Sequence, residues 1–238
     1  MVRRVGAVAG AVLFAGYAAQ TVGLQYTTPS TSAFVTGLYV VMTPVLDAAL
    51  ERRVPSRAVL VGIALATVGL ALLTGASLDL GLGVWLSLLC ALLFACHIVF
   101  VGVFAPSVPT LAFTGLQLGA VAVLSVPATA VDGVGAVTAL AVFAVVFTGI
   151  ACSAVALPLQ VWGQRRIPPA RAALILLAEP VFAGIASWID GEHLDGTQLL
   201  GALVILTGIV ISEVSTRDDD RRGDEPTSGE PIDDVEAG

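Results

Sequence analysis

Two long stretches of this sequence contain no aspartate, glutamate, lysine or arginine, and they restrict the folds open to the chain. They cover residues 80–131 and 133–164. About 20 apolar residues cross a bilayer, so each stretch is long enough to span it. Only 12% of the residues are charged, against about 25% in soluble domains, and the mean hydropathy is +0.94. The sequence therefore predicts an all-α, polytopic helical membrane protein.

Breaks in the apolar sequence divide it into eight expected transmembrane helices. Proline accompanies hydroxyl residues at two of the breaks, 27–30 and 106–109. Proline cannot donate a hydrogen bond to a helix and disfavours helix in the residue before it, so these segments end the helices beside them. The eight helices are expected near residues 5–24, 31–50, 57–75, 82–104, 110–129, 136–162, 170–189 and 196–215.

The eleven basic residues, all of them arginine, test this count. With eight alternating spans, every arginine falls on the same side of the membrane, which the positive-inside rule makes cytoplasmic. We therefore expect a multi-pass protein of the plasma membrane with both termini in the cytoplasm. The arginines are Arg3, Arg4, Arg52, Arg53, Arg57, Arg165, Arg166, Arg171, Arg217, Arg221 and Arg222. The opposite side carries Asp79, Asp132, Asp190, Glu192 and Asp195.

Residues 20–69 recur loosely as residues 160–208. The matched residues keep a nearly constant offset of 140 or 139, which corresponds to five of the expected helices. Because five is odd, the two copies have opposite orientations in the membrane, and such inverted repeats are typical of secondary transporters. The matched pairs are Gln20 and Gln160, Gly23 and Gly163, Pro29 and Pro169, Gly62 and Gly201, and Gly69 and Gly208.

The chain resembles the EamA-type permeases of the drug/metabolite transporter superfamily over about residues 5–215. The resemblance rests on a run of small residues before a proline, on Ala178-Glu179-Pro180, and on Gly191-Glu192 followed by Gly201. It implies a ten-helix fold of two inverted five-helix halves, and this chain begins where the third helix of the family would begin. We therefore expect eight transmembrane helices from an inverted five-plus-five repeat with two N-terminal helices missing.

This resemblance also suggests the organisation and the function of the chain. Residues 1–75 would form a partial first repeat and residues 76–215 the second, and the acidic residues 216–238 would form a disordered cytoplasmic tail. The expected function is a secondary transporter of small metabolites that works by alternating access and is coupled to protons. The alternative is a non-transporting, truncated membrane protein or assembly partner. An enzyme is not expected, because no nucleophile–base pair is evident.

Glu179 is the sharpest candidate for a functional residue, since it lies deep in the seventh expected span. A charge at such a depth costs roughly 2.5–3.5 kcal/mol, and residues of this kind are usually functional. The carboxyl could carry protons, or it could be a protonated acid hydrogen-bonded within the bundle. Pro180 follows it and can break the helix, and Thr43-Pro44 occupies the place in the first repeat that we take as equivalent.

Other polar and aromatic residues in the spans complete the candidate pathway for substrate or protons. His97 could relay protons near neutral pH or could simply pack between helices. The repeat-matched amides of Gln20 and Gln160 could join helices or bind a polar ligand. The aromatic side chains that could line a cavity are Tyr17, Tyr39 and Trp162.

No cofactor or metal is expected, because the cysteines and histidines lack the spacing of a metal site. The expected partners are the lipid bilayer and a small-molecule substrate, with a homodimer as an open alternative and no nucleic acid.

Overall fold

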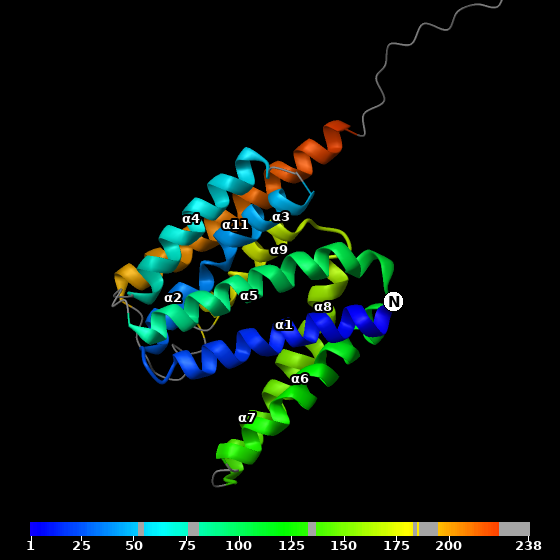
Figure 1. Cartoon of the computed structure of the whole chain (residues 1–238). Coiled ribbons are helices and arrows are strands. Elements are labelled where there is room, and N and C mark those ends of the chain that lie inside the picture. The colour runs from blue at the N-terminus through cyan, green and yellow to red at the C-terminus, as the bar shows by residue number, and fades with distance from the viewer. Residues whose placement is uncertain (52–54, 76–80, 133–136, 183–184, 186–194, 224–238) are drawn as a thin grey trace, which may run out of the picture.

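The computed structural model describes residues 1–51, 55–75, 81–132, 137–182, 185 and 195–223. Every regular element in these residues is a helix, which confirms the expected all-α class (Figure 1). The helices are α1 (Val2–Gly23), α2 (Pro29–Gly37), α3 (Tyr39–Glu51), α4 (Arg57–Thr74), α5 (Leu82–Phe104), the short 3₁₀ helix η1 (Ala105–Ser107), α6 (Thr110–Asp132), α7 (Ala139–Phe147), the π-helical segment η2 (Thr148–Val155), α8 (Ala156–Gly163), α9 (Pro169–Leu176) and α11 (Gly196–Gly223).

Six helical stretches in the described residues are long and apolar enough to cross a membrane, so the chain is a multi-pass membrane protein. They are Val2–Gly23, Pro29–Leu50, Arg57–Thr74, Leu82–Ser107, Thr110–Pro127 and Ala139–Gly163, and α11 contains a shorter apolar part, Gly196–Ser212. The seventh expected span, 170–189, lies partly outside the described residues. Helix α11 continues to Gly223, past the expected end at residue 215, and residues 224–238 of the expected tail lie outside.

Local sequence signals explain where several helices begin and end. The Thr28 hydroxyl accepts a hydrogen bond from the Thr31 amide at 3.2 Å and caps α2, whose first residue is Pro29. Ser56 caps α4 in the same way, through the Val59 amide at 3.4 Å. Helix α4 ends at Gly75, whose φ of 56° lies in the left-handed region that glycine adopts without strain.

Helices α4 and α11 lie side by side and pack through glycines (Figure 1). A Cβ on Gly62 would lie 2.6 Å from the Gly208 carbonyl oxygen, and a Cβ on Gly69 would lie 2.6 Å from the Gly201 carbonyl oxygen. The pairing of 62 with 208 and of 69 with 201 makes the two helices antiparallel. The backbones approach as closely as they do because all four positions lack a side chain.

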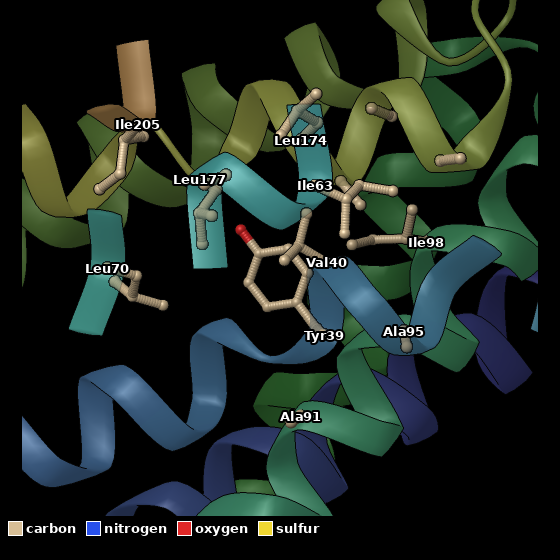
Figure 2. Packing of buried hydrophobic residues seen from close by; sticks show 14 of the residues in the cluster. Tyr39, Val40, Ile63, Leu70, Ala91, Ala95, Ile98, Leu174, Leu177 and Ile205 are labelled. Atoms are coloured by element: carbon tan, nitrogen blue, oxygen red, sulfur yellow. The ribbon is translucent and has the colours of Figure 1, made fainter. Parts of the chain in front are cut away.

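The main buried cluster lies where α3, α4, α5, α9 and α11 meet. Figure 2 shows Tyr39 among its members, together with Val40, Ile63, Leu174 and Leu177. On the other side of α5, helix α1 packs against both α5 and α6. The far half of α6 and all of α7 project from the rest of the bundle (Figure 1), and α7 buries none of its residues.

Candidate functional site

The second and seventh expected spans are each broken near the middle, and the two breaks have the same hydrogen bonds. The Leu38 amide donates to the carbonyl three residues earlier at 3.2 Å, and its own carbonyl accepts from the amides three and four residues later at 3.0 and 3.2 Å. At Ala178 the corresponding three distances are 3.0, 3.0 and 3.2 Å. Leu38 and Ala178 therefore have the same local hydrogen bonds, and they are separated by the offset of 140 that also separates Gln20 from Gln160.

The two breaks give a different alignment from the one that pairs Glu179 with Thr43. Counted from the two breaks, the counterpart of Glu179 is Tyr39. Pro44 does not mark the break in its span, since it lies inside α3 and the break falls at Leu38. The sequence offset of 140 also relates Glu179 to Tyr39, whereas Thr43 was chosen because Pro44 follows it as Pro180 follows Glu179. Pro180 lies two residues beyond Ala178.

Tyr39 and Glu179 each follow one of the two breaks by a single residue. The Glu179 carboxyl interacts electrostatically with the hydroxyls of both Tyr39 and Tyr17. Tyr39 is buried at 9% exposure, whereas Tyr17 is 46% exposed. Glu179 is surrounded by protein on most sides and still remains accessible. Three candidates from three separate helical segments therefore lie within electrostatic range of one another in the bundle.

The wall of this site beside Tyr17 is formed by α5 and the π-helical segment. The Phe94 ring meets the Tyr17 ring edge-on, with 5.6 Å between centroids and 81° between planes. Cys90 and Cys152 also lie within electrostatic reach of Tyr17. Cys152 belongs to η2, and π-helical segments are frequent at functional sites. Sequence reasoning treated these cysteines as packing residues and did not select Phe94, because nothing in an apolar run distinguishes its lining residues.

Thr36, two residues before the break in the second span, adds a polar group to the same region. Its side chain is 6% exposed and lies beside the Cys90 thiol. The buried Thr36 hydroxyl oxygen has no hydrogen-bond partner among the described residues. A buried hydroxyl in this state costs free energy, which a bound water or substrate would recover.

His97 belongs to a different pair. Its Nε2 atom lies 2.7 Å from the Oε1 atom of Gln117 on α6, and both side chains are buried, at 3% and 0% exposure. The Gln117 amide nitrogen has no hydrogen-bond partner within the described residues. No interaction in that part of the chain joins His97 to Glu179. The structure therefore places this candidate in the interface between α5 and α6, where sequence reasoning had not selected Gln117.

Gln160 and Trp162 lie near the end of α8, away from the Glu179 site. Gln160 donates to the Gln164 side chain at 3.1 Å, and Gln164 donates to the Ile98 carbonyl at 2.8 Å. Trp162 is 53% exposed, and the Arg166 guanidinium lies over its ring at 4.4 Å. The repeat-matched Gln20 is half-buried in the last turns of α1. None of the three contacts Glu179 through an interaction found among the described residues.

Apolar side chains close the bundle between Glu179 and the end that carries Arg171. Here α3 packs directly on α5 and α9, and α5 on α9. The closure is made by Val40, Ile98 and Leu174, all buried to 4% exposure or less. Tyr17 and Glu179 both retain exposed surface.

Nothing in the described structure suggests a metal centre. Within those residues, no three histidine, cysteine, aspartate or glutamate side chains are placed to hold a metal ion together. Glu192, expected on the side opposite the arginines, lies outside the described ranges.

Comparison with known proteins gives a family and a fold. Residues 81–213 match the model of the family described as "EamA-like transporter family". An "Uncharacterized transporter" of Archaeoglobus fulgidus is 34% identical over 206 residues, which are 85% of this chain and 66% of that protein. This chain thus spans just under two thirds of the length of that curated relative. A solved structure, described only as "Crystal structure of protein", has a TM-score of 0.76 at 19% identity and covers 92% of this chain and 87% of its own.

Proposed function

Because this chain belongs to the EamA-like transporter family, as its motifs predicted, we propose that it is a secondary transporter of small metabolites. The observation that carries this proposal is the meeting of Tyr39 and Glu179 at two equivalent helix breaks in the middle of the bundle. Broken helices whose ends face a site at mid-membrane are the usual binding arrangement of secondary transporters. The proposed activity is transport and includes no catalytic step.

The architecture that goes with this function is an inverted repeat of eight helices. Residues 1–75 form the partial first repeat and residues 76–215 the second. Two observations support the inversion: the breaks at Leu38 and Ala178 have matching hydrogen bonds, and the repeat-matched glycines of α4 and α11 meet in antiparallel helices. A two-fold axis between the helices would exchange the two repeats. Gly62 would then take the place of Gly201, and Gly208 the place of Gly69. The contact of Gly62 with Gly208 would become the contact of Gly201 with Gly69, which is the second contact observed.

We place both termini in the cytoplasm and the protein in the plasma membrane. The arginines in the described residues support this orientation. Arg165 and Arg166, in the segment before α9, lie near the start of α4, whose first residue is Arg57. A single cavity is lined by Ser56, Arg165 and Arg171. Arginines that are distant in sequence therefore gather at one end of the bundle, which the positive-inside rule makes cytoplasmic.

With this orientation, the conformer is closed toward the cytoplasm and accessible from the outside. Val40, Ile98 and Leu174 form the closure. In alternating access, the two repeats exchange their conformations. The closure on the cytoplasmic side then opens, and the outer side closes. In this mechanism Glu179 exchanges its proton with one side of the membrane at a time, and the adjacent tyrosine hydroxyls supply hydrogen bonds to the carboxyl or to the substrate.

Reconstituted vesicles with a pH-sensitive dye inside test the proposal and identify the substrate in the same experiment. A panel of metabolites is added outside, and a substrate is recognised by the proton flux that accompanies it. We expect Glu179→Gln to abolish this coupled flux and to leave folding unchanged. The matched control is Asp195→Asn, which also replaces a carboxyl by an amide, but at an exposed position. The Gln198 amide donates a hydrogen bond to the Asp195 side chain, and an asparagine can still accept it. Undiminished proton flux with Glu179→Gln would exclude Glu179 as the proton carrier.

A second candidate function, an assembly partner without transport of its own, is favoured by the exposed surface of residues 139–163. Only 6% of an 18-residue stretch of this span is buried, so its apolar side chains are free to meet lipid or another protein. Cys152 is exposed in this span, whereas Cys90 is buried. If a second copy covers the surface, oxidative crosslinking in membranes should give a disulfide-linked dimer through Cys152. A wholly monomeric product, with metabolite flux in the vesicles, would exclude this alternative.

A further inference from the structure

A cavity of about 580 Å³ opens at the arginine-rich end of the bundle, separate from the Glu179 site. Its walls come from the end of α3, the start of α4, the end of α5 and the segment between α8 and α9. Three arginines line it, Arg165, Arg166 and Arg171, together with one acidic residue, the buried Asp47. The cavity is therefore suited to an anion.

The guanidinium of Arg165 is held in place by the protein. Its Nη1 atom donates to the Val108 carbonyl and to the Thr110 hydroxyl, each at 3.2 Å. Both bonds use the same nitrogen, which leaves the other N–H groups of the guanidinium available to a ligand. A guanidinium that is already oriented loses less side-chain freedom when it binds a phosphate through paired hydrogen bonds.

An apolar groove of about 500 Å³ adjoins this cavity, and Val103 lines both. Leu46 and Leu50 of α3 form one wall of the groove, and Cys96, Phe100 and Phe104 of α5 form the other. No charged side chain lines it. The groove runs along the membrane-spanning part of α5, while the charged cavity lies at the end of that helix.

Trp162 marks the depth of the cavity relative to the membrane. Tryptophan is enriched at the level of the lipid headgroups, and Trp162 is 53% exposed at the end of α8. Arg166, which lines the cavity, lies over its ring at 4.4 Å and donates to its carbonyl at 3.3 Å. The guanidinium groups thus stand at headgroup level, and the apolar groove extends from there toward the hydrocarbon.

We propose that the cavity and the groove together form a binding site for one anionic phospholipid. The phosphate headgroup lies against Arg165 and Arg166, and an acyl chain occupies the groove between α3 and α5. A zwitterionic lipid fills the groove equally well, but its own cation opposes the three guanidinium groups. The site therefore selects lipids by charge at one end and retains them through the acyl chain at the other.

Native mass spectrometry of the detergent-purified full-length chain tests the headgroup contact, with phosphatidylglycerol and phosphatidylcholine of identical acyl chains. We expect preferential retention of phosphatidylglycerol. Arg166→Gln should weaken it about fivefold, the effect of losing one arginine near an anionic lipid. Arg166→Lys should preserve most of the binding. Arg4→Gln, the same charge change at an exposed residue of α1 outside the cavity, should have no effect. Equal retention of the two lipids, or equal loss in Arg4→Gln and Arg166→Gln, would overturn the proposal.

A second arm separates a lipid from a soluble anion. Cys96→Trp places bulk in the groove without touching the arginines, and it should weaken phosphatidylglycerol by at least fivefold while the melting temperature stays near that of the parent protein. An excess of glycerol 3-phosphate should not displace the lipid. If Cys96→Trp retains the lipid fully and glycerol 3-phosphate displaces it, the cavity binds a soluble anion and the lipid site is wrong.

Discussion

Replacing Gly69 by alanine should force α4 and α11 apart, because a Cβ at this position has no room. It would lie 2.6 Å from the Gly201 carbonyl oxygen, 2.8 Å from the Ile205 amide nitrogen and 2.9 Å from the Ile205 Cγ1 atom. Favourable contacts between heavy atoms begin at about 3.5 Å. The backbone of α11 would have to retreat by most of an ångström, since two of the three atoms belong to it and cannot rotate away.

The expected cost follows from a comparison with Gly115 in α6. Overpacking of this kind costs about 1–3 kcal/mol. Alanine also favours the helix over glycine by about 1 kcal/mol. At Gly115 nothing lies within 4 Å of the added Cβ, so Gly115→Ala gains the helix term without the clash. The helix term cancels between the two variants, and their free energies of unfolding should differ by the overpacking cost alone, about 1–3 kcal/mol.

Denaturant unfolding of both variants in detergent, followed by tryptophan fluorescence, measures this difference. Gly201→Ala should behave like Gly69→Ala, since its Cβ would meet the Gly69 carbonyl oxygen. The reasoning is refuted if Gly69→Ala is as stable as Gly115→Ala, because the helices would then separate at no cost.

Two further substitutions test the buried polar groups. Tyr39→Phe removes only the hydroxyl that interacts with Glu179. It should reduce transport about 10–100-fold, which corresponds to the loss of a hydrogen bond to a charged group, with little change in melting temperature. Tyr26→Phe is the control, since Tyr26 is 57% exposed, and this variant should transport normally. His97→Leu should destabilise the fold by about 1–3 kcal/mol, because it leaves Gln117 buried without its partner. The double variant, His97→Leu with Gln117→Leu, should lose less stability than His97→Leu alone. If unfolding experiments show that the losses of the two single variants add up, the reasoning is contradicted.

The positions of the spans could be predicted from the sequence because the bilayer imposes them. A helix that crosses hydrocarbon must be apolar over a fixed length, and proline ends it in predictable ways. The long uncharged runs and the prolines therefore located the six spans found in the described residues, and the motifs indicated the family. The expected start of the fourth helix at residue 82 and its end at 104 agree with α5.

The interior of the site could not be predicted, because the lining residues of an apolar bundle have no sequence signature. Glu179 was selected since a charge at that depth is costly, but its partner depends on where each span breaks. The break at Leu38 is set by backbone hydrogen bonds, and Pro44, the apparent marker, lies within α3.

The sequence by itself determined that this chain crosses the membrane several times, and which residues are polar inside it. Those properties follow from composition and length, because a segment that crosses the hydrocarbon must be apolar over the thickness of the bilayer. Only the tertiary structure decided where the second and seventh spans break, and that His97 pairs with Gln117. These contacts join residues from different helices, and the packing of helices depends on side-chain shape at every interface. The glycines show the same division: the repeat identified them as equivalent, and the packing of α4 on α11 placed them face to face.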